Sequence, residues 1–262
     1  STGASSNQAS QSANGISPKL SATVDGPDNW LTTASLARTT RFPTLTELYG
    51  MSNCLTTIST CADTTYKSTA TGNLSPEMVT SAELSFEKTE ALKNYRVTFF
   101  GESVKDAILQ QYGYLYPSVN PSGLYQYWQN VEKVHAYGIE LAANFKNAGI
   151  TGLDLYGQVT RVWSAIDESS SLGGSAQSVE GNPITYVSPW RATVMATYRP
   201  DEKFTFSMAG RYQEAGASSL DNNDIKRDTY GGFQSFFVID AKVRYQLDKK
   251  WSASFGIDNI EN

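Results

Sequence analysis

Hydrophobic and polar residues alternate with a period of two along most of this chain. The clearest stretch runs from residue 239 to 247, where every second residue is apolar and the residues between are charged or polar. The apolar positions are Ile239, Ala241, Val243, Tyr245 and Leu247, and the polar ones are Asp240, Lys242, Arg244 and Gln246. Because successive side chains of a strand point to opposite faces, this pattern predicts a β-strand with one apolar and one polar face.

The connections between such stretches alternate between short and long. Short polar turns fall at residues 25–29, 89–94, 147–151, 200–203 and 248–250, and long loops at 41–76, 108–130, 167–188 and 217–234. Each stretch between a turn and a loop predicts one strand. We expect ten strands, near residues 16–24, 30–40, 77–88, 95–107, 131–146, 152–166, 189–199, 204–216, 235–247 and 251–260.

An all-β fold with short turns at one end and long loops at the other is typical of an antiparallel transmembrane β-barrel. In such barrels the short turns are periplasmic and the long loops are extracellular. The alternation also fits a soluble β-sandwich, for example a carbohydrate-binding domain, whose apolar faces would pack against each other.

Strand length and the position of aromatic residues favour the membrane. Runs of about eleven residues extend roughly 36 Å, and a tilt near 45° reduces this to about 25 Å, the height of the apolar band of such a barrel. Large aromatic residues border the short turns on the apolar face, where amphipathic rings form an interfacial girdle. They are Trp30, Tyr95, Tyr198, Phe204, Tyr245 and Trp251.

Composition narrows the alternatives. The 262 residues are 40% hydrophobic, with a mean hydropathy of −0.37, and the lack of a run of about 18 apolar residues excludes a transmembrane helix. The net charge of −5 argues against a nucleic-acid-binding surface.

No stretch resembles a signal peptide, so for a secreted barrel we expect a missing N-terminus. The low-complexity residues 1–15 predict a flexible loop remnant.

Four short motifs resemble those of TonB-dependent outer-membrane receptors. They are RFPTLTELY at 41–49, NLSPE at 73–77 followed by ELSF at 83–86, NVEKV at 130–134 followed by YGIE at 137–140, and FGIDNIEN at 255–262. The first is similar to a proline-containing stretch before a long loop of that family, and the last to its penultimate strand. The motifs occur in the family's order and span nearly the whole chain.

The resemblance implies a barrel of about 22 strands whose pore is closed by an N-terminal plug. It also implies a Gram-negative outer-membrane receptor, in contact with lipid and lipopolysaccharide, that imports scarce nutrients. These are mostly ferric siderophores, but also haem, cobalamin, other metal chelates or glycans. The TonB complex supplies energy by engaging a segment ahead of the plug. This chain holds neither plug nor that segment, so we expect an incomplete arc of about ten meander strands, a fragment of a longer receptor.

Two classes of function stay open within this resemblance. One is active import of a metal chelate, and the other is a passive pore or surface adhesin that shares only the barrel wall. No cofactor and no enzymatic activity are expected. The single histidine, His135, shares strand parity with Tyr137, Ile139 and Leu141, so it should face outward near the upper rim, where it cannot join a catalytic triad in the lumen.

The best candidates for ligand contact lie in the second long loop, which is rich in aromatic residues. Tyrosine and tryptophan present broad apolar faces with a hydrogen-bonding tip, which suits flat catecholate or aromatic chelates. Alternatively, these rings pack the loop against its neighbours or sit in the outer headgroup belt. The residues are Tyr112, Tyr114, Tyr116, Tyr125, Tyr127 and Trp128.

Two other loops carry residues with possible metal or redox chemistry. Cys54 and Cys61 are the only cysteines, and their spacing suits a disulfide that staples the first long loop in an oxidising compartment. The alternative is a metal pair helped by Met51. In the last loop, residues 221–228 hold three aspartates, but their spacing is not that of a defined Ca²⁺ loop, so a solvated acidic loop is expected and no metal site is assigned.

Overall fold

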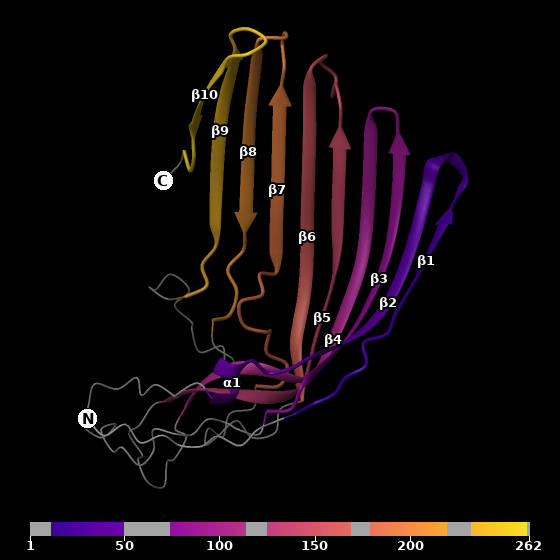
Figure 1. Cartoon of the computed structure of the whole chain (residues 1–262), viewed down its shortest axis with the longest axis vertical. Helices are drawn as coiled ribbons and strands as arrows, with labels where there is room; N and C mark the ends of the chain where they lie inside the picture. The colour runs from indigo at the N-terminus through magenta and orange to yellow at the C-terminus, as the bar shows by residue number, and fades with distance from the viewer. Residues whose placement is uncertain (1–11, 50–73, 114–124, 169–178, 219–231, 261–262) are drawn as a thin grey trace, which may run out of the picture.

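Ten strands form one antiparallel sheet in which each strand pairs with the next along the chain. The structure, a computed structural model, describes residues 12–49, 74–113, 125–168, 179–218 and 232–260. The strands are β1 (Lys19–Asp25), β2 (Trp30–Arg41), β3 (Glu77–Glu90), β4 (Lys93–Gly113), β5 (Tyr125–Phe145), β6 (Leu153–Glu168), β7 (Trp190–Tyr198), β8 (Phe204–Gln213), β9 (Phe236–Gln246) and β10 (Ser252–Ile257). Figure 1 shows them side by side in a curved, open sheet.

Short connections lie at one end of the sheet, here named the turn end, and long connections at the other, the loop end. The turn end joins β1 to β2, β3 to β4, β5 to β6, β7 to β8 and β9 to β10, and is uppermost in Figure 1. The short helix α1 (Leu45–Tyr49) lies at the loop end. This is the alternation of connection lengths that the sequence predicts.

Strand register gives the sheet one apolar and one polar face. Residues that pair across antiparallel strands share a face. Val243 of β9 pairs with Phe206 of β8 and with Phe255 of β10, on the apolar face. Its neighbour Lys242 pairs with Ser207, on the polar face. The period-two pattern of the sequence is therefore confirmed in β8, β9 and β10.

The apolar face is uncovered in the part of the chain that the structure describes. Leu36, Val194 and Met208 on this face are more than half exposed, at 53%, 59% and 53%. Small polar residues on the opposite face are buried by their neighbours, with Ser85 at 4% and Thr160 at 6%. Side chains crowd together on the concave side of a curved sheet, so the sheet curves toward its polar face. A sandwich would bury the apolar face instead, and that alternative is wrong for these residues.

Side-chain caps stabilise the turn end. Asp201 Oδ1 accepts hydrogen bonds from the backbone N–H groups of Lys203 and Phe204, both at 2.8 Å. Asp248 Oδ1 does the same for Lys250 and Trp251, at 2.7 and 2.9 Å. Aspartate side chains favour tight turns because they supply such local acceptors.

Aromatic rings meet on the apolar face beside these turns, as expected for a girdle. The rings of Phe204 and Tyr245, paired across β8 and β9, have centroids 4.8 Å apart. Tyr95 of β4 contacts Phe145 of β5 edge-to-face at 5.4 Å. The cation of Lys88 lies 5.6 Å from the ring of Trp30, its cross-strand partner.

The loop end differs from the sequence expectation in three places. β4 and β5 run past the expected limits of 95–107 and 131–146, which places Tyr112, Tyr125, Tyr127 and Trp128 on strands rather than in a loop. The alternation of apolar and polar residues fades there, but aromatic residues keep their preference for strands. Helix α1 falls inside the expected loop 41–76. No helix among the described residues is long and apolar enough to span a membrane.

Part of the expected loop 167–188 also continues the sheet. Ile166 N–H donates to Asn182 O and Val162 N–H donates to Pro189 O, both at 2.9 Å, so residues 179–189 run alongside β6. They close a small core at the loop end with Ala107, Val131, Val134, Ile166 and Val179.

Candidate functional site

Three of the sequence motifs converge at the loop end around one arginine. Arg41, the last residue of β2, donates through Nε to Glu77 Oε2 at the start of β3. Its Nη1 donates to Glu47 Oε1 of α1 at 3.0 Å. Both carboxylates are largely buried, with side-chain exposures of 9% for Glu47 and 11% for Glu77. Buried carboxylates need such charge-assisted partners.

The helix beside this arginine begins with a capping box. Thr44 Oγ1 accepts from Glu47 N–H at 3.3 Å, and Glu47 Oε2 accepts from Thr44 N–H at 2.7 Å. Burial raises the pKa of the Glu47 carboxyl, but hydrogen bonds from Thr44 and Arg41 outweigh burial and hold its pKa below the usual glutamate range. Glu47 is therefore ionised at neutral pH.

The same site anchors the irregular part of β4. Glu77 Oε1 accepts from Ile108 N–H at 2.5 Å, just after Asp106, whose φ of 57° marks a break in the regular strand. Asn130 of β5 donates to Asp106 O at 2.6 Å and accepts from Ser75 N–H at 2.8 Å. Asn130 thus ties β5 to both neighbouring segments.

Apolar contacts complete this loop-end junction, in which Leu48, Leu74 and Ile108 form a buried cluster against Trp128. Parts of three of the four motifs that carry the family resemblance are therefore joined here. The sequence analysis did not predict the polar residues of this junction, which are Arg41, Glu47, Glu77 and Asn130. The spacing Thr44-x-x-Glu47 is that of a capping box, and it could have predicted the start of helix α1. Because the side chains of Arg41, Glu47, Glu77 and Asn130 all have protein partners, we interpret the junction as a structural latch.

The polar face carries charged side chains from every strand between β3 and β9. Some of these charges pair: Arg96 Nη2 lies 3.5 Å from Glu83, and Arg211 Nη2 donates to Asp240 at 3.0 Å. Among the described residues no ion pair joins Arg191, Lys242 or Arg244 to an acid.

The predicted ligand-contact aromatics lie on or beyond the ends of β4 and β5. Tyr112 pairs with Gln126, and Tyr127 pairs with Gln111. Tyr125 pairs with Gly113 at the end of the ladder. Trp128 packs against the apolar cluster of the junction, which fits the packing alternative for this ring. Tyr114 and Tyr116 lie outside the described residues.

Two further predictions fall on residues that the structure does not describe. Cys54 and Cys61, expected to form a disulfide, lie outside it, as do Met51 and the acidic residues 221–228.

His135 lies on the apolar face near the loop end, as its strand parity predicts. Its Nδ1 is 2.5 Å from Asp167 Oδ1, and its ring stacks on Tyr137 with centroids 5.9 Å apart. Ser103 pairs with His135 across β4 and β5, yet no hydrogen bond joins the hydroxyl to the ring in this part of the chain.

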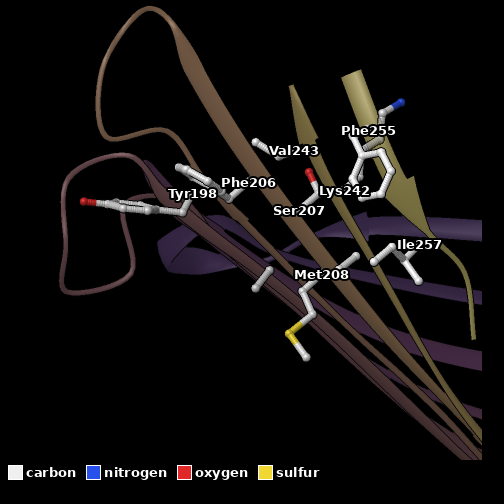
Figure 2. A pocket seen from close by; sticks show the side chains of 10 residues that line it. Tyr198, Phe206, Ser207, Met208, Lys242, Val243, Phe255 and Ile257 are labelled. Carbon is white, nitrogen blue, oxygen red and sulfur yellow. The ribbon is translucent and has the colours of Figure 1, made fainter. Parts of the chain in front are cut away.

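A hollow of about 380 Å³ opens on the apolar face between β7 and β10. Figure 2 shows Met208, Phe206 and Phe255 around it, and the small Ala196 and Ala241 also line it. Its lining is almost wholly apolar, so it has few of the convergent polar groups that orient a specific ligand. On a lipid-facing surface a hydrocarbon tail fills such a space.

Comparison with protein families matches residues 1–260 to the model described as "TonB dependent receptor-like, beta-barrel". The comparison with curated protein sequences finds no relative of this chain.

Several solved structures share this fold. The copper transporter OprC superposes with a TM-score of 0.65 at 18% identity, over 92% of this chain and 33% of that one. A mutant of the ferric enterobactin receptor PfeA from Pseudomonas aeruginosa gives 0.64 at 16%, over 93% and 34%. The unliganded ferric citrate transporter FecA gives 0.62 at 17%, over 93% and 33%. The chain thus spans about a third of the length of these proteins.

Proposed function

We propose that this chain, which belongs to the TonB-dependent receptor-like β-barrel family, forms part of the wall of an outer-membrane receptor. The receptor uses energy from TonB to take up a metal chelate, and a ferric siderophore is the first candidate for that chelate. The receptor resides in the outer membrane of a Gram-negative cell, in contact with lipid and lipopolysaccharide. A plug and a TonB-contacting segment belong to the rest of the receptor.

The observation that carries this proposal is the pairing of an exposed apolar face with a polar, charged one. The apolar face suits contact with lipid, and the polar face suits a water-filled lumen. The structural neighbours add support for the cargo, because they are named as copper, ferric enterobactin and ferric citrate transporters or receptors. Transport rather than catalysis is therefore the proposed activity.

The loop end is the proposed site of ligand capture, since binding residues concentrate in the loops of a rigid scaffold. Tyr112, Tyr114, Tyr116, Tyr125 and Tyr127 are the proposed aromatic contacts for a flat chelate, whereas Trp128 serves mainly the junction. A Cys54–Cys61 disulfide is proposed to hold the first long loop.

Uptake of radioactive iron by whole cells tests the proposal. The complete receptor is produced in cells that lack other iron-chelate receptors, with and without an active TonB complex. We expect chelate-specific uptake that needs TonB and saturates at low chelate concentration. A passive pore would instead give linear uptake that persists without TonB, and that result would favour the rival function.

A further inference from the structure

Four cations occupy the polar face of β7, β8 and β9, and all four are exposed. Only one acid, Asp240, shares that face of these three strands. The chain as a whole carries an excess of acids, with a net charge of −5, so a basic stripe is not a by-product of composition. The cations are Arg191, Arg211, Lys242 and Arg244.

Strand register arranges these cations as a diagonal. Arg191 of β7 lies opposite Gln213 of β8, near the loop end. Arg211 of β8 is two residues nearer the turn end, and Lys242 and Arg244 of β9 lie opposite Ser207 and Thr205. Gln213 and Thr205 are eight residues apart on β8, and this separation is roughly 27 Å at about 3.4 Å per residue. The diagonal therefore leads from the loop end nearly to the turn end.

The positive charge of the diagonal is largely uncompensated. Arg211 pairs with Asp240 at 3.0 Å, yet its side chain stays 56% exposed. Asp240 also accepts from Asn259 N–H at 3.0 Å, which holds this carboxylate in place. Lys242 and Arg244 lie on the same face of one strand, about 7 Å apart, and repel each other. Their cross-strand partners in β8 are the neutral Ser207 and Thr205.

The acids of the polar face gather on other strands. In β3 to β6 the only cation on that face is Arg96, which already pairs with Glu83 at 3.5 Å. The acids there are Glu77, Glu83, Glu87, Glu102, Glu140 and Asp154. The wall is thus divided into an acidic part and a basic part. A mobile anion would be repelled by the first and attracted by the second.

We propose that the diagonal of Arg191, Arg211, Lys242 and Arg244 is a binding path for an anionic metal chelate, which the receptor selects by negative net charge. Steps of about 7 to 14 Å between neighbouring cations allow an anion to pass from one to the next without a single tight site. Neighbouring hydroxyl groups of Thr193, Thr205 and Ser207 offer hydrogen bonds along the way. This inference rests on the proposed import function and adds its cargo class.

Uptake of two iron chelates of opposite character tests the path in cells that produce the complete receptor. One probe is a ferric tris-catecholate, which is an anion, and the other is a ferric tris-hydroxamate without net charge. The test variant is Lys242→Gln with Arg244→Gln. The matched control is Lys249→Gln with Lys250→Gln, which removes two cations from the turn after β9. Receptor at the cell surface is quantified for each variant.

We expect the wild type to take up the anionic probe. At low ionic strength the initial rate of uptake by the test variant should be about tenfold lower than that of the wild type, because about tenfold is the lower bound of the effect of electrostatic steering. The control variant should keep the wild-type rate, and Lys242→Arg should keep it too because charge is conserved. Raising the salt concentration should shrink the difference between wild type and test variant.

Other outcomes separate this inference from the function beneath it. If the test variant takes up the anionic probe at the wild-type rate, the path is refuted while TonB-dependent import stands. Wild-type uptake of the neutral probe alone refutes the path in the same way. Absence of TonB-dependent uptake for both probes refutes the path together with the proposed function.

Discussion

Arg41 contacts the carboxylates of two different elements, and Glu77 in turn caps the backbone of a third. Removing one charged side chain from this set leaves its buried partners without their hydrogen bonds. The free energy lost is larger than the net contribution of an ordinary hydrogen bond, because the remaining buried group is left unsatisfied. The junction is thus the part of the molecule where single residues should matter most for stability.

Glu77→Gln is expected to lower the free energy of unfolding of the complete receptor by about 1–3 kcal/mol, because it weakens charge-assisted bonds to Arg41 and Ile108. Urea unfolding in lipid vesicles measures the change. Glu90→Gln on the same strand is the control: it removes only an exposed pair with Lys88 at 3.7 Å, expected to contribute about 0.5 kcal/mol or less. Equal losses in both variants would show that the junction is not a latch.

Glu47 makes the junction sensitive to acid. The pKa of the Glu47 carboxyl is lower in the folded than in the unfolded chain. Its contribution to the free energy of unfolding is therefore complete above the ordinary glutamate pKa of about 4.3, and it is lost as the pH falls through the lowered folded-state pKa. We expect the unfolding free energy to fall less between about pH 6 and pH 3 in Glu47→Gln than in the wild type. Identical pH profiles would contradict this assignment.

At the scale of elements, the turn between β5 and β6 depends on glycine for a specific reason. Gly152 has a φ of +85°, and a Cβ there would lie 2.1 Å from Arg199 O. Gly149 has a φ of +74° but open space around it. The first position therefore combines a left-handed backbone with a steric limit, and the second has only the backbone requirement.

Gly152→Ala is expected to destabilise the receptor by roughly 3 kcal/mol, whereas Gly149→Ala should cost about 1 kcal/mol, the strain of a left-handed alanine. Unfolding of both variants in lipid vesicles gives the comparison. A Gly152→Ala variant no less stable than Gly149→Ala would mean that the approach of Arg199 is not as close as described.

The elements also show how far the sequence could predict the fold. Strands such as β9 were predictable because apolar and polar residues alternate over their whole length. The ends of β4 and β5 were not, since the alternation stops near Asp106 and aromatic residues then remain the only signal. Ion pairs on the polar face were predictable only in part, because they join residues on a diagonal rather than residues directly opposite: Arg96 lies opposite Glu87 yet pairs with Glu83, and Arg211 lies opposite Val238 yet pairs with Asp240.

At the scale of the whole molecule, the sheet is open, and β1 and β10 pair on one side only among the described residues. Unpaired backbone groups are not tolerated in the hydrocarbon core. We therefore expect further strands of the receptor beside both edges. In the proposed receptor, the division of the polar face into acidic and basic parts gives the lumen one side that attracts anions.

Spin-label accessibility along β9 tests the central claim, that the apolar face meets lipid and the polar face meets water. Single cysteines replace residues 239–246 in turn, with Cys54 and Cys61 changed to serine, and the complete receptor is placed in lipid vesicles. We predict a period of two: labels at Ile239, Ala241, Val243 and Tyr245 collide with oxygen dissolved in the bilayer, and those between them with a water-soluble nickel reagent. Uniform access to nickel along the strand, or the opposite alternation, would contradict the account.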